Sequence, residues 1–432
     1  MPRDTVFHRY ESNVRSYCRE FPVVFERAGG AYLWDTAGRR YVDLLCGAGA
    51  LNYGHNPPEI TRRLVEYLGA GGPVQSLDLY TVAKAEFLEK FVEIVLAPRD
   101  MCDYVMQFPG PAGTLAVEAA LKLARKVTGR STVIAFTGGF HGASLGSLAA
   151  SSSPVLRGAA GLPLAGVSVL PYDGFLGDQD SAAVLQAMLR PGSGIDPPAA
   201  VLLETVQGEG GLTAASAGWL RAVQQAARDA GALLIVDDIQ AGCGRTGRFF
   251  STEHVPGLDP DIICLSKSLS GLGLPMAMTL IRRDLDHWRP GEHNGTFRGH
   301  NLAFVTGAAA LDYWADPAFT AQLDQFAETV RAGLTRLAGD LAEQAGRPVA
   351  TVVGRGTMSG LRFADPAVTA RIKDELFRAN VIAETSGGGR TLKLFPPLTM
   401  RPAEWTPVAD LIADVTLETV GGHAGLRSLA AV

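Results

Sequence analysis

Two neighbouring stretches, LLIVDDIQAGCGRTG at residues 233–247 and DIICLSKSLS at residues 261–270, decide the fold of this chain. Each contains a run of four apolar residues, as strands buried on both faces do. Polar side chains follow the two runs: Asp237, Asp238 and Gln240 after the first, and Lys267 after the second. Residues just past the carboxyl ends of neighbouring parallel strands meet at one crevice. The pattern therefore predicts a cofactor site at the edge of an α/β sheet.

Composition limits the classes of protein to which the chain can belong. It has 432 residues, of which 47% are hydrophobic, and a formal net charge of −5. At roughly 150 residues per domain, two or three domains are expected. The small net charge and the lack of a long charged run argue against nucleic acid or a membrane as a partner.

The N-terminus and the cysteines predict a cytoplasmic protein. Residues 1–20 are polar and charged where a signal peptide would be apolar. No uncharged apolar run approaches the ~18 residues of a membrane span. The five cysteines are scattered and form no CxxC pair, which argues against a disulfide framework or structural zinc.

Strands and helices alternate through the middle of the chain, which predicts a mostly parallel sheet covered on both faces. Strands are expected at 104–108, 132–136, 199–203 and 277–281, with helices at 60–68, 82–96, 115–127 and 219–230. Towards the C-terminus, long helices at 319–344 and 404–420 alternate with short apolar runs. We expect a large domain at 56–310 and a small α/β domain built from 1–55 and 311–432.

The sequence GCGRTG at residues 242–247 matches the G-x-G-x-x-G pattern of dinucleotide sites. The residues that follow it, RFFSTEHVPGLDP, lack the apolar period that the helix of such a site requires. A nicotinamide-dependent oxidoreductase therefore remains only a remote alternative. The eight histidines show no close metal-ligand pairing, so no metal site is predicted.

The loop PGPAGT at residues 109–114 precedes a predicted helix, and a helix N-terminus can hold a phosphate. The loop could equally be a turn with Thr114 as the N-cap. Together with Lys267, Asp237 and the aromatic ring of Phe140, it supplies an anion cradle, an amine, a carboxylate and a stacking face. An aldehyde cofactor with a phosphate tail and a pyridine ring requires those four groups.

Several ordered segments resemble the class III pyridoxal-phosphate aminotransferases, and most closely their diaminobutyrate:2-oxoglutarate group. They span residues 49–399 and include GALNYGHN, QFPGPAGT, AFTGGFHG, ETVQGEGG, LSKSLSG, GTFRGHN and LKLFPPLT. The resemblance implies the fold-type I architecture, with a large domain around a mostly parallel sheet and a small α/β domain. It also implies pyridoxal 5'-phosphate as the cofactor and a homodimer with shared active sites, or a higher oligomer.

The resemblance assigns a role to each matching residue on the cofactor side. Lys267 would bond the cofactor and act as the general base, and Asp237 would pair with the ring nitrogen, supported by Asp238. The other cofactor contacts would be Gln240 at the phenolic oxygen, Phe140 stacked on the ring, His141 beside it, Gly113 and Thr114 at the phosphate, and Thr296 from the other subunit. Core packing is the alternative for Phe140 and His141.

On the substrate side, the resemblance implies Glu209 as a gate and Glu204 as a lining residue, although a structural role is as well supported for Glu204. Lys393 stands where ornithine-type members carry an arginine, a change that the diaminobutyrate group shares. We expect Glu209 to pair with Lys393 while the donor is bound. Ala143 replaces another arginine of those members. Leu115 and the segment 71–81 depart from the diaminobutyrate pattern and bear on the choice of donor.

The sequence thus predicts a ping-pong transaminase that takes the terminal amine of a diamino acid such as 2,4-diaminobutyrate. Glutamate and 2-oxoglutarate would form the other couple. The first alternative is a transaminase for another ω-amine in a specialised biosynthetic pathway. A cofactor-binding protein without turnover is the alternative from a different class.

Overall fold

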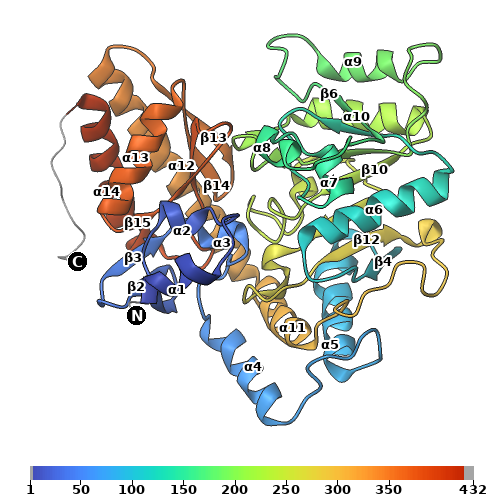
Figure 1. Ribbon diagram of the computed structural model, residues 1–432, viewed down its shortest axis with the longest axis horizontal. Coiled ribbons are helices and arrows are strands. Elements are labelled where there is room, and N and C mark those ends of the chain that lie inside the picture. The colour runs from blue at the N-terminus through green and yellow to red at the C-terminus, as the bar shows by residue number, and fades with distance from the viewer. Residues whose placement is uncertain (1–2, 423–432) are drawn as a thin grey trace.

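The computed structural model describes residues 3–422, and a seven-stranded sheet forms the core of its larger part (Figure 1). The strand order is β4-β12-β11-β10-β7-β5-β6. Neighbouring strands are parallel except around β12, which runs antiparallel to β11 and β4. The strands are β4 (Tyr104–Gln107), β5 (Val133–Phe136), β6 (Val167–Leu170), β7 (Ala200–Leu203), β10 (Leu233–Asp237), β11 (Ile262–Leu265) and β12 (Met278–Arg282). The predicted mostly parallel sheet is confirmed.

Helices cover both faces of this sheet. Along β10, Leu234 and Val236 pack in a cluster with helix α10 (Ala217–Asp229), while Ile235 packs in a cluster with α6 (Gly113–Thr128). Successive strand side chains point to opposite faces, so a strand covered on both sides must be apolar throughout. Further helices around the sheet are α4 (Pro58–Gly69), α5 (Val82–Lys90), α7 (Leu145–Ala150), α8 (Pro154–Gly158), α9 (Ser181–Met188) and α11 (Asn301–Ala315).

Both ends of the chain build the remaining part, at the left of Figure 1. Strand β15 pairs in parallel with β3, so an N-terminal and a C-terminal segment share one sheet. The first sheet contains β1 (Phe25–Gly29), β2 (Tyr32–Asp35), β3 (Arg40–Asp43) and β15 (Val381–Ile382); the second contains β13 (Ala350–Arg355), β14 (Met358–Phe363), β17 (Thr391–Leu394) and β16 (Glu384–Ser386). The helices here are α1 (Arg3–Tyr10), α2 (Tyr17–Glu20), α12 (Pro317–Ala345), α13 (Pro366–Arg378) and α14 (Pro402–Gly421).

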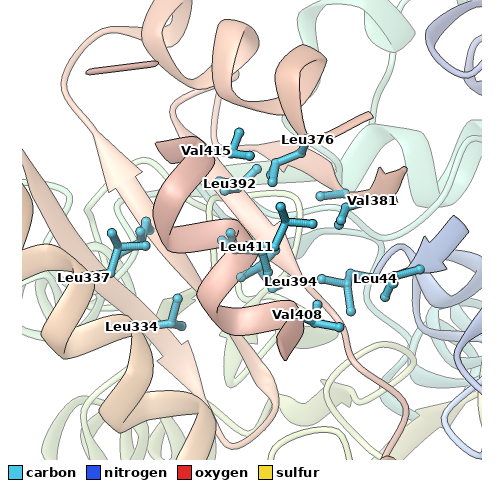
Figure 2. Packing of buried hydrophobic residues seen from close by; sticks show 14 of the residues in the cluster. Leu44, Leu334, Leu337, Leu376, Val381, Leu392, Leu394, Val408, Leu411 and Val415 are labelled. Atoms are coloured by element: carbon cyan, nitrogen blue, oxygen red, sulfur yellow. The ribbon is translucent and has the colours of Figure 1, made fainter. Parts of the chain in front are cut away.

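One apolar cluster holds this part together (Figure 2). Leu44 follows β3, Leu392 and Leu394 lie on β17, Leu337 comes from α12 and Leu411 from α14. Burial of each such side chain contributes about 1.5–3 kcal/mol relative to exposure. Residues from both ends of the chain therefore share one core, and this core fixes the position of β17.

The strands and long helices expected from the sequence are present, and their ends differ from the predicted ones by no more than two residues. The helix expected at 82–96 is α5 followed by a π-helical turn, Phe91–Leu96. Helix α11 was not predicted, because it is apolar on nearly all sides and buried, so its sequence has no amphipathic period. Residue 310 lies inside α11, and the domain division at 55 and 310 stays a prediction.

Within residues 3–422, no helix combines the length and the apolar character needed to cross a membrane. The GCGRTG segment forms turns and is followed by a short 3-10 helix, Ser251–His254, in place of the helix that a dinucleotide site requires. Its Arg245 is fully buried and donates to Asn52 and to the carbonyl of Pro396. This segment therefore joins the two parts of the molecule.

Candidate active site

The two strand ends identified in the sequence lie side by side. Strands β10 and β11 are adjacent and parallel, with Asp237 opposite Cys264. Asp237 ends β10, and Lys267 comes two residues after β11 in a left-handed backbone conformation, with φ of +49°. The Lys267 amine donates to the carbonyl oxygen of Ala48, which is 2.9 Å away. Asp237 and Lys267 therefore lie at the same edge of the sheet, as the sequence predicted.

The electrostatic surroundings favour a neutral Lys267 amine. Burial, followed by the positive charge of Lys393, lowers the pKa of Lys267 to about 8, although Glu209, Glu384 and Asp237 oppose the shift. A buried ammonium loses hydration, so the neutral form is favoured. A lysine with such a pKa is unprotonated in part near neutral pH and can act as a nucleophile or as a base.

Asp237 has a partner that the sequence did not reveal. Its Oδ2 lies 2.8 Å from Nδ1 of His141, and both side chains are buried. Burial opposes protonation of the imidazole, but the hydrogen bond and the charge of Asp237 outweigh it and raise the pKa of His141. His141 therefore orients the carboxylate. Asp238 lies behind it, accepts from the Ser251 amide, and has its pKa raised to about 7 by burial.

Glu204 binds two loops of the site together. One carboxylate oxygen accepts from the amide of Phe140 at 3.0 Å and the other from the amide of Gly208 at 3.1 Å. Burial raises the pKa of Glu204 to about 7. These backbone contacts favour the structural role that the sequence left open. The ring of Phe140 lines the cleft that also contains Lys267.

The phosphate cradle expected at the start of α6 is present as a helix N-terminus beginning at Gly113. The Thr114 hydroxyl is already bonded to the hydroxyls of Ser144 and Ser147. Glu118 accepts from the Ser144 hydroxyl and from the Ser147 backbone amide. The backbone amides of the first turn, rather than this hydroxyl, are thus the groups that face an anion most readily. A Cβ at Gly113 would lie 3.2 Å from Ile239, so a larger residue would crowd the turn.

A cleft of about 1050 Å³ joins the lysine to the second part of the molecule. It is lined by Lys267, Phe140 and Glu209 from the large part and by Tyr17 and Arg362 from the other part. A cleft of this size can hold a cofactor together with a small substrate. Among residues 3–422, no cluster of His, Cys, Asp and Glu side chains suited to a metal ion occurs.

Glu209, which lines the cleft, pairs with Lys393, as the sequence predicted. Lys393 Nζ donates to Glu209 Oε1 at 2.8 Å and also lies 2.8 Å from Glu384 Oε2. Tyr17 donates to the other oxygen of Glu384 at 2.8 Å. Burial disfavours the Lys393 charge, but the two carboxylates outweigh it and raise its pKa. Burial likewise disfavours the Glu209 charge, yet Lys393 holds the pKa of Glu209 below its usual value.

Sequence reasoning missed Tyr17 and Glu384. Glu384 stands directly opposite Lys393 in the antiparallel pair of β16 and β17. The sequence ETSGGGRTLK, with its three glycines between two short runs, carries a hairpin signal that could have placed the two residues together. Tyr17 lies on a four-residue helix in the N-terminal arm, and no local pattern links it to the cleft.

Thr296 does not line the cleft of its own chain. It lies on an exposed segment, and its carbonyl accepts from the side chain of Gln75 at 2.6 Å. A role for Thr296 in the site therefore requires a second copy of the chain.

Comparison with known proteins identifies the family to which the chain belongs. The model of the family described as "Aminotransferase class-III" matches residues 14–416. The chain belongs to the class-III aminotransferases. A diaminobutyrate–2-oxoglutarate transaminase of Halalkalibacterium halodurans is 49% identical, covering 91% of this chain and 92% of the relative.

Two further proteins extend the comparison. A diaminobutyrate–2-oxoglutarate transaminase of Bordetella parapertussis is 50% identical, covering 94% of this chain and 93% of that protein. A solved ornithine aminotransferase of Toxoplasma gondii, in which partial occupancy of PLP is described, is 25% identical with a TM-score of 0.81, covering 96% of this chain and 94% of its own. This class-III aminotransferase thus shares its fold with a pyridoxal-phosphate enzyme.

The cofactor of class-III aminotransferases is pyridoxal phosphate, and the site fits this group. The Lys267 amine, which is partly buried and lines the cleft, can bond an aldehyde, and the buried Asp237 carboxylate suits a protonated ring nitrogen. Gln240 donates to the Ala48 carbonyl, and among the described residues its buried Oε1 has no hydrogen-bond partner. An unpartnered polar atom next to Lys267 is the kind of group that a polar cofactor would satisfy.

Proposed function

We propose that the protein transfers the terminal amine of a diamino acid, such as 2,4-diaminobutyrate, to 2-oxoglutarate. The observation that carries the proposal is the Lys267 amine, which lines one cleft together with Glu209, the ion-pair partner of Lys393. The names of the relatives at about 50% identity support the choice of substrates. The cytoplasm is the compartment that we propose for this reaction.

The residues that would hold the cofactor come from the strand ends and from α6. Pyridoxal phosphate supplies an aldehyde and an electron-withdrawing ring when it is bound. Lys267 would hold the aldehyde carbon and Asp237 the ring nitrogen, with His141 orienting that carboxylate. The remaining contacts would be Phe140 against the ring, Gln240 at the phenolic oxygen, and the amides of Gly113 and Thr114 at the phosphate.

Once a donor amine has taken the place of Lys267 on the aldehyde carbon, the freed Lys267 amine would serve as the base of the reaction. Its lowered pKa, about 8, allows the amine to accept a proton from the carbon that bears the donor nitrogen and to return it elsewhere. The Ala48 carbonyl holds the amine at 2.9 Å and sets its direction.

Glu209 would act as a gate between the two half-reactions. With a diamino acid present, Glu209 stays paired to Lys393 at 2.8 Å. For glutamate or 2-oxoglutarate, the Glu209 side chain would turn away and Lys393 would meet a carboxylate of that substrate. Lysine is a single point charge and cannot form the bidentate pair that arginine makes, so it holds that carboxylate less rigidly.

A homodimer would complete each site with Thr296 of the second copy, and higher assembly is compatible with this. Support comes from the exposed apolar residues close to Thr296: Phe297, and across the Gln75 contact Leu79, Tyr80 and Val82. Tyr80 is 100% exposed in the single chain. Apolar surface of this kind marks a protein interface.

A donor screen with 2-oxoglutarate as the acceptor tests the function. We expect 2,4-diaminobutyrate to give the highest kcat/KM among terminal amines that include ornithine, lysine and 4-aminobutyrate. A different preferred ω-amine would favour the first alternative. No turnover with any amine, in a protein that still shows the visible absorbance of the bound cofactor, would refute the proposed activity.

A further inference from the structure

Lys393 is held between two carboxylates that behave differently. It lies 2.8 Å from Glu209 Oε1 on one side and 2.8 Å from Glu384 Oε2 on the other. The side chain of Glu209 is 37% exposed, that of Glu384 11% and that of Lys393 1%. Glu209 therefore faces the cleft, and the Lys393–Glu384 pair lies behind it.

The contact between Glu384 and Lys393 is fixed by the sheet. The two residues are cross-strand partners in β16 and β17, and Lys393 is also paired on its other side with Gly360 of β14. Separating their backbones would break the sheet. Tyr17 donates to the second oxygen of Glu384 at 2.8 Å and restrains its rotation.

Glu209, by contrast, can leave Lys393 by side-chain rotation alone. Its backbone is held, because a Cβ at Gly208 would lie 1.8 Å from the Gln240 side chain and one at Gly210 would lie 2.6 Å from that of Gln207. Its carbonyl also accepts from the amide of Gly387 at 2.9 Å. Glu384 is thus the permanent partner of Lys393, and Glu209 is the exchangeable one.

The charges of these three groups set the local preference of the cleft beside Lys393. One ammonium and two carboxylates sum to −1 while Glu209 is in place, and the remaining pair sums to 0 when Glu209 turns away. Without Glu384 the corresponding sums would be 0 and +1. Lys393 therefore never presents an uncompensated positive charge to a carboxylate, and the closed arrangement attracts an ammonium group.

We propose that Glu384, restrained by Tyr17, is a specificity-determining residue that favours substrates with a distal ammonium group and weakens the binding of dicarboxylates. The proposal rests on the proposed function, because it names the residue that sets the substrate preference of that same site. In this proposal, the Glu384 carboxylate discriminates between substrates with a distal ammonium group and dicarboxylates. The Glu209–Lys393 pair alone would not provide this discrimination.

The test is Glu384→Gln, which removes the charge and keeps the shape and the hydrogen-bonding capacity. Glutarate is a dicarboxylate that lacks the keto group of 2-oxoglutarate and therefore does not react. Its binding to the holoenzyme is measured by calorimetry at low salt. We expect the variant to bind glutarate on the order of fivefold more tightly and to show a KM for 2,4-diaminobutyrate that is raised by a similar factor. Tyr17→Phe should shift both quantities in the same directions by a smaller factor.

Glu375→Gln is the matched control, since Glu375 pairs with the exposed Arg378 on α13, and it should leave both quantities unchanged. Equal weakening of glutarate and donor in Glu384→Gln, or no change in either, would overturn the proposal. If Glu384→Gln fails to fold, Tyr17→Phe decides, and unchanged glutarate affinity in that variant also overturns it. Failure of the proposed function would give a different result. The wild-type enzyme would convert no diamino acid, while Glu384→Gln would still bind glutarate more tightly than the wild type does.

Discussion

The cofactor end and the substrate end of the cleft are built in different ways. At the cofactor end, Asp237 and Lys267 project from the ends of two adjacent strands, 30 positions apart in the chain. At the substrate end, Tyr17, Glu209 and the Glu384–Lys393 pair come from distant segments that meet only in the folded molecule. The first arrangement follows from sheet topology. The second depends on how the two parts of the protein meet, and this is where we propose that the substrate preference is set.

Removal of the Lys267 amine should have the largest effect. We expect Lys267→Ala to fold, to lose the visible absorbance of the bound cofactor, and to lose turnover by at least ~10²–10⁴-fold, the contribution typical of a positioned base. Steady-state rates with 2-oxoglutarate and an absorbance spectrum measure both effects. Lys126→Ala, which alters a surface pair with Glu292, is the control. Normal turnover in Lys267→Ala would disprove the assignment of the cofactor end.

The cofactor end could be predicted because its signals are local. An apolar run followed by a polar residue marks a buried strand that ends at a site, and the structure places Asp237 and Lys267 as this rule requires. The contact between His141 and Asp237 could not be predicted, because 96 residues separate them and His141 lies in a loop. The same holds for the Ala48 carbonyl, which reaches Lys267 from a left-handed turn of the N-terminal part.

The substrate end was predicted only in part. The Glu209–Lys393 contact was predicted from the need for a switchable charge near the cofactor, whereas the second carboxylate depends on the register of β16 against β17. A shift of one residue would turn Glu384 to the other face of the sheet. The segment 71–81, which we expected to bear on the choice of donor, is largely exposed and contacts the Thr296 segment through Gln75.

Loss of the Thr296 hydroxyl tests whether the cofactor end is completed by a second subunit. A hydrogen bond to a charged group contributes ~1.5–3 kcal/mol, so Thr296→Ala should weaken cofactor affinity by roughly 10- to 150-fold. Equilibrium dialysis of the cofactor gives the constant. Thr419→Ala, which removes a hydroxyl bonded within α14, is the control. A fully active monomer would contradict the shared site.

The pH dependence of cofactor uptake probes the buried amine directly. The pKa of Lys267 is lowered to about 8, mainly by burial, so the reactive neutral amine dominates above pH 8 and becomes rare below it. Uptake of the cofactor by the stripped protein should therefore slow as pH falls, by up to about tenfold per unit below 8. Stopped-flow absorbance between pH 6 and pH 9 measures the rate. A midpoint near 10.4, the value of an ordinary lysine, would show that the amine is not perturbed.

The smallest expected effects concern the gate. Glu209→Ala should impair the diamino acid half-reaction and favour the glutamate half-reaction, but only by a few-fold, because the Lys393–Glu384 pair that remains is neutral. Lys393→Met should do the reverse, raising the KM for 2-oxoglutarate and sparing the first half-reaction. It also leaves two carboxylates without their cation, which is strongly destabilising, so its thermal midpoint must be measured alongside. Single-turnover spectra separate the two half-reactions. If both variants slow both halves equally, the ion pair is structural, and the substrate end is as rigid as the cofactor end.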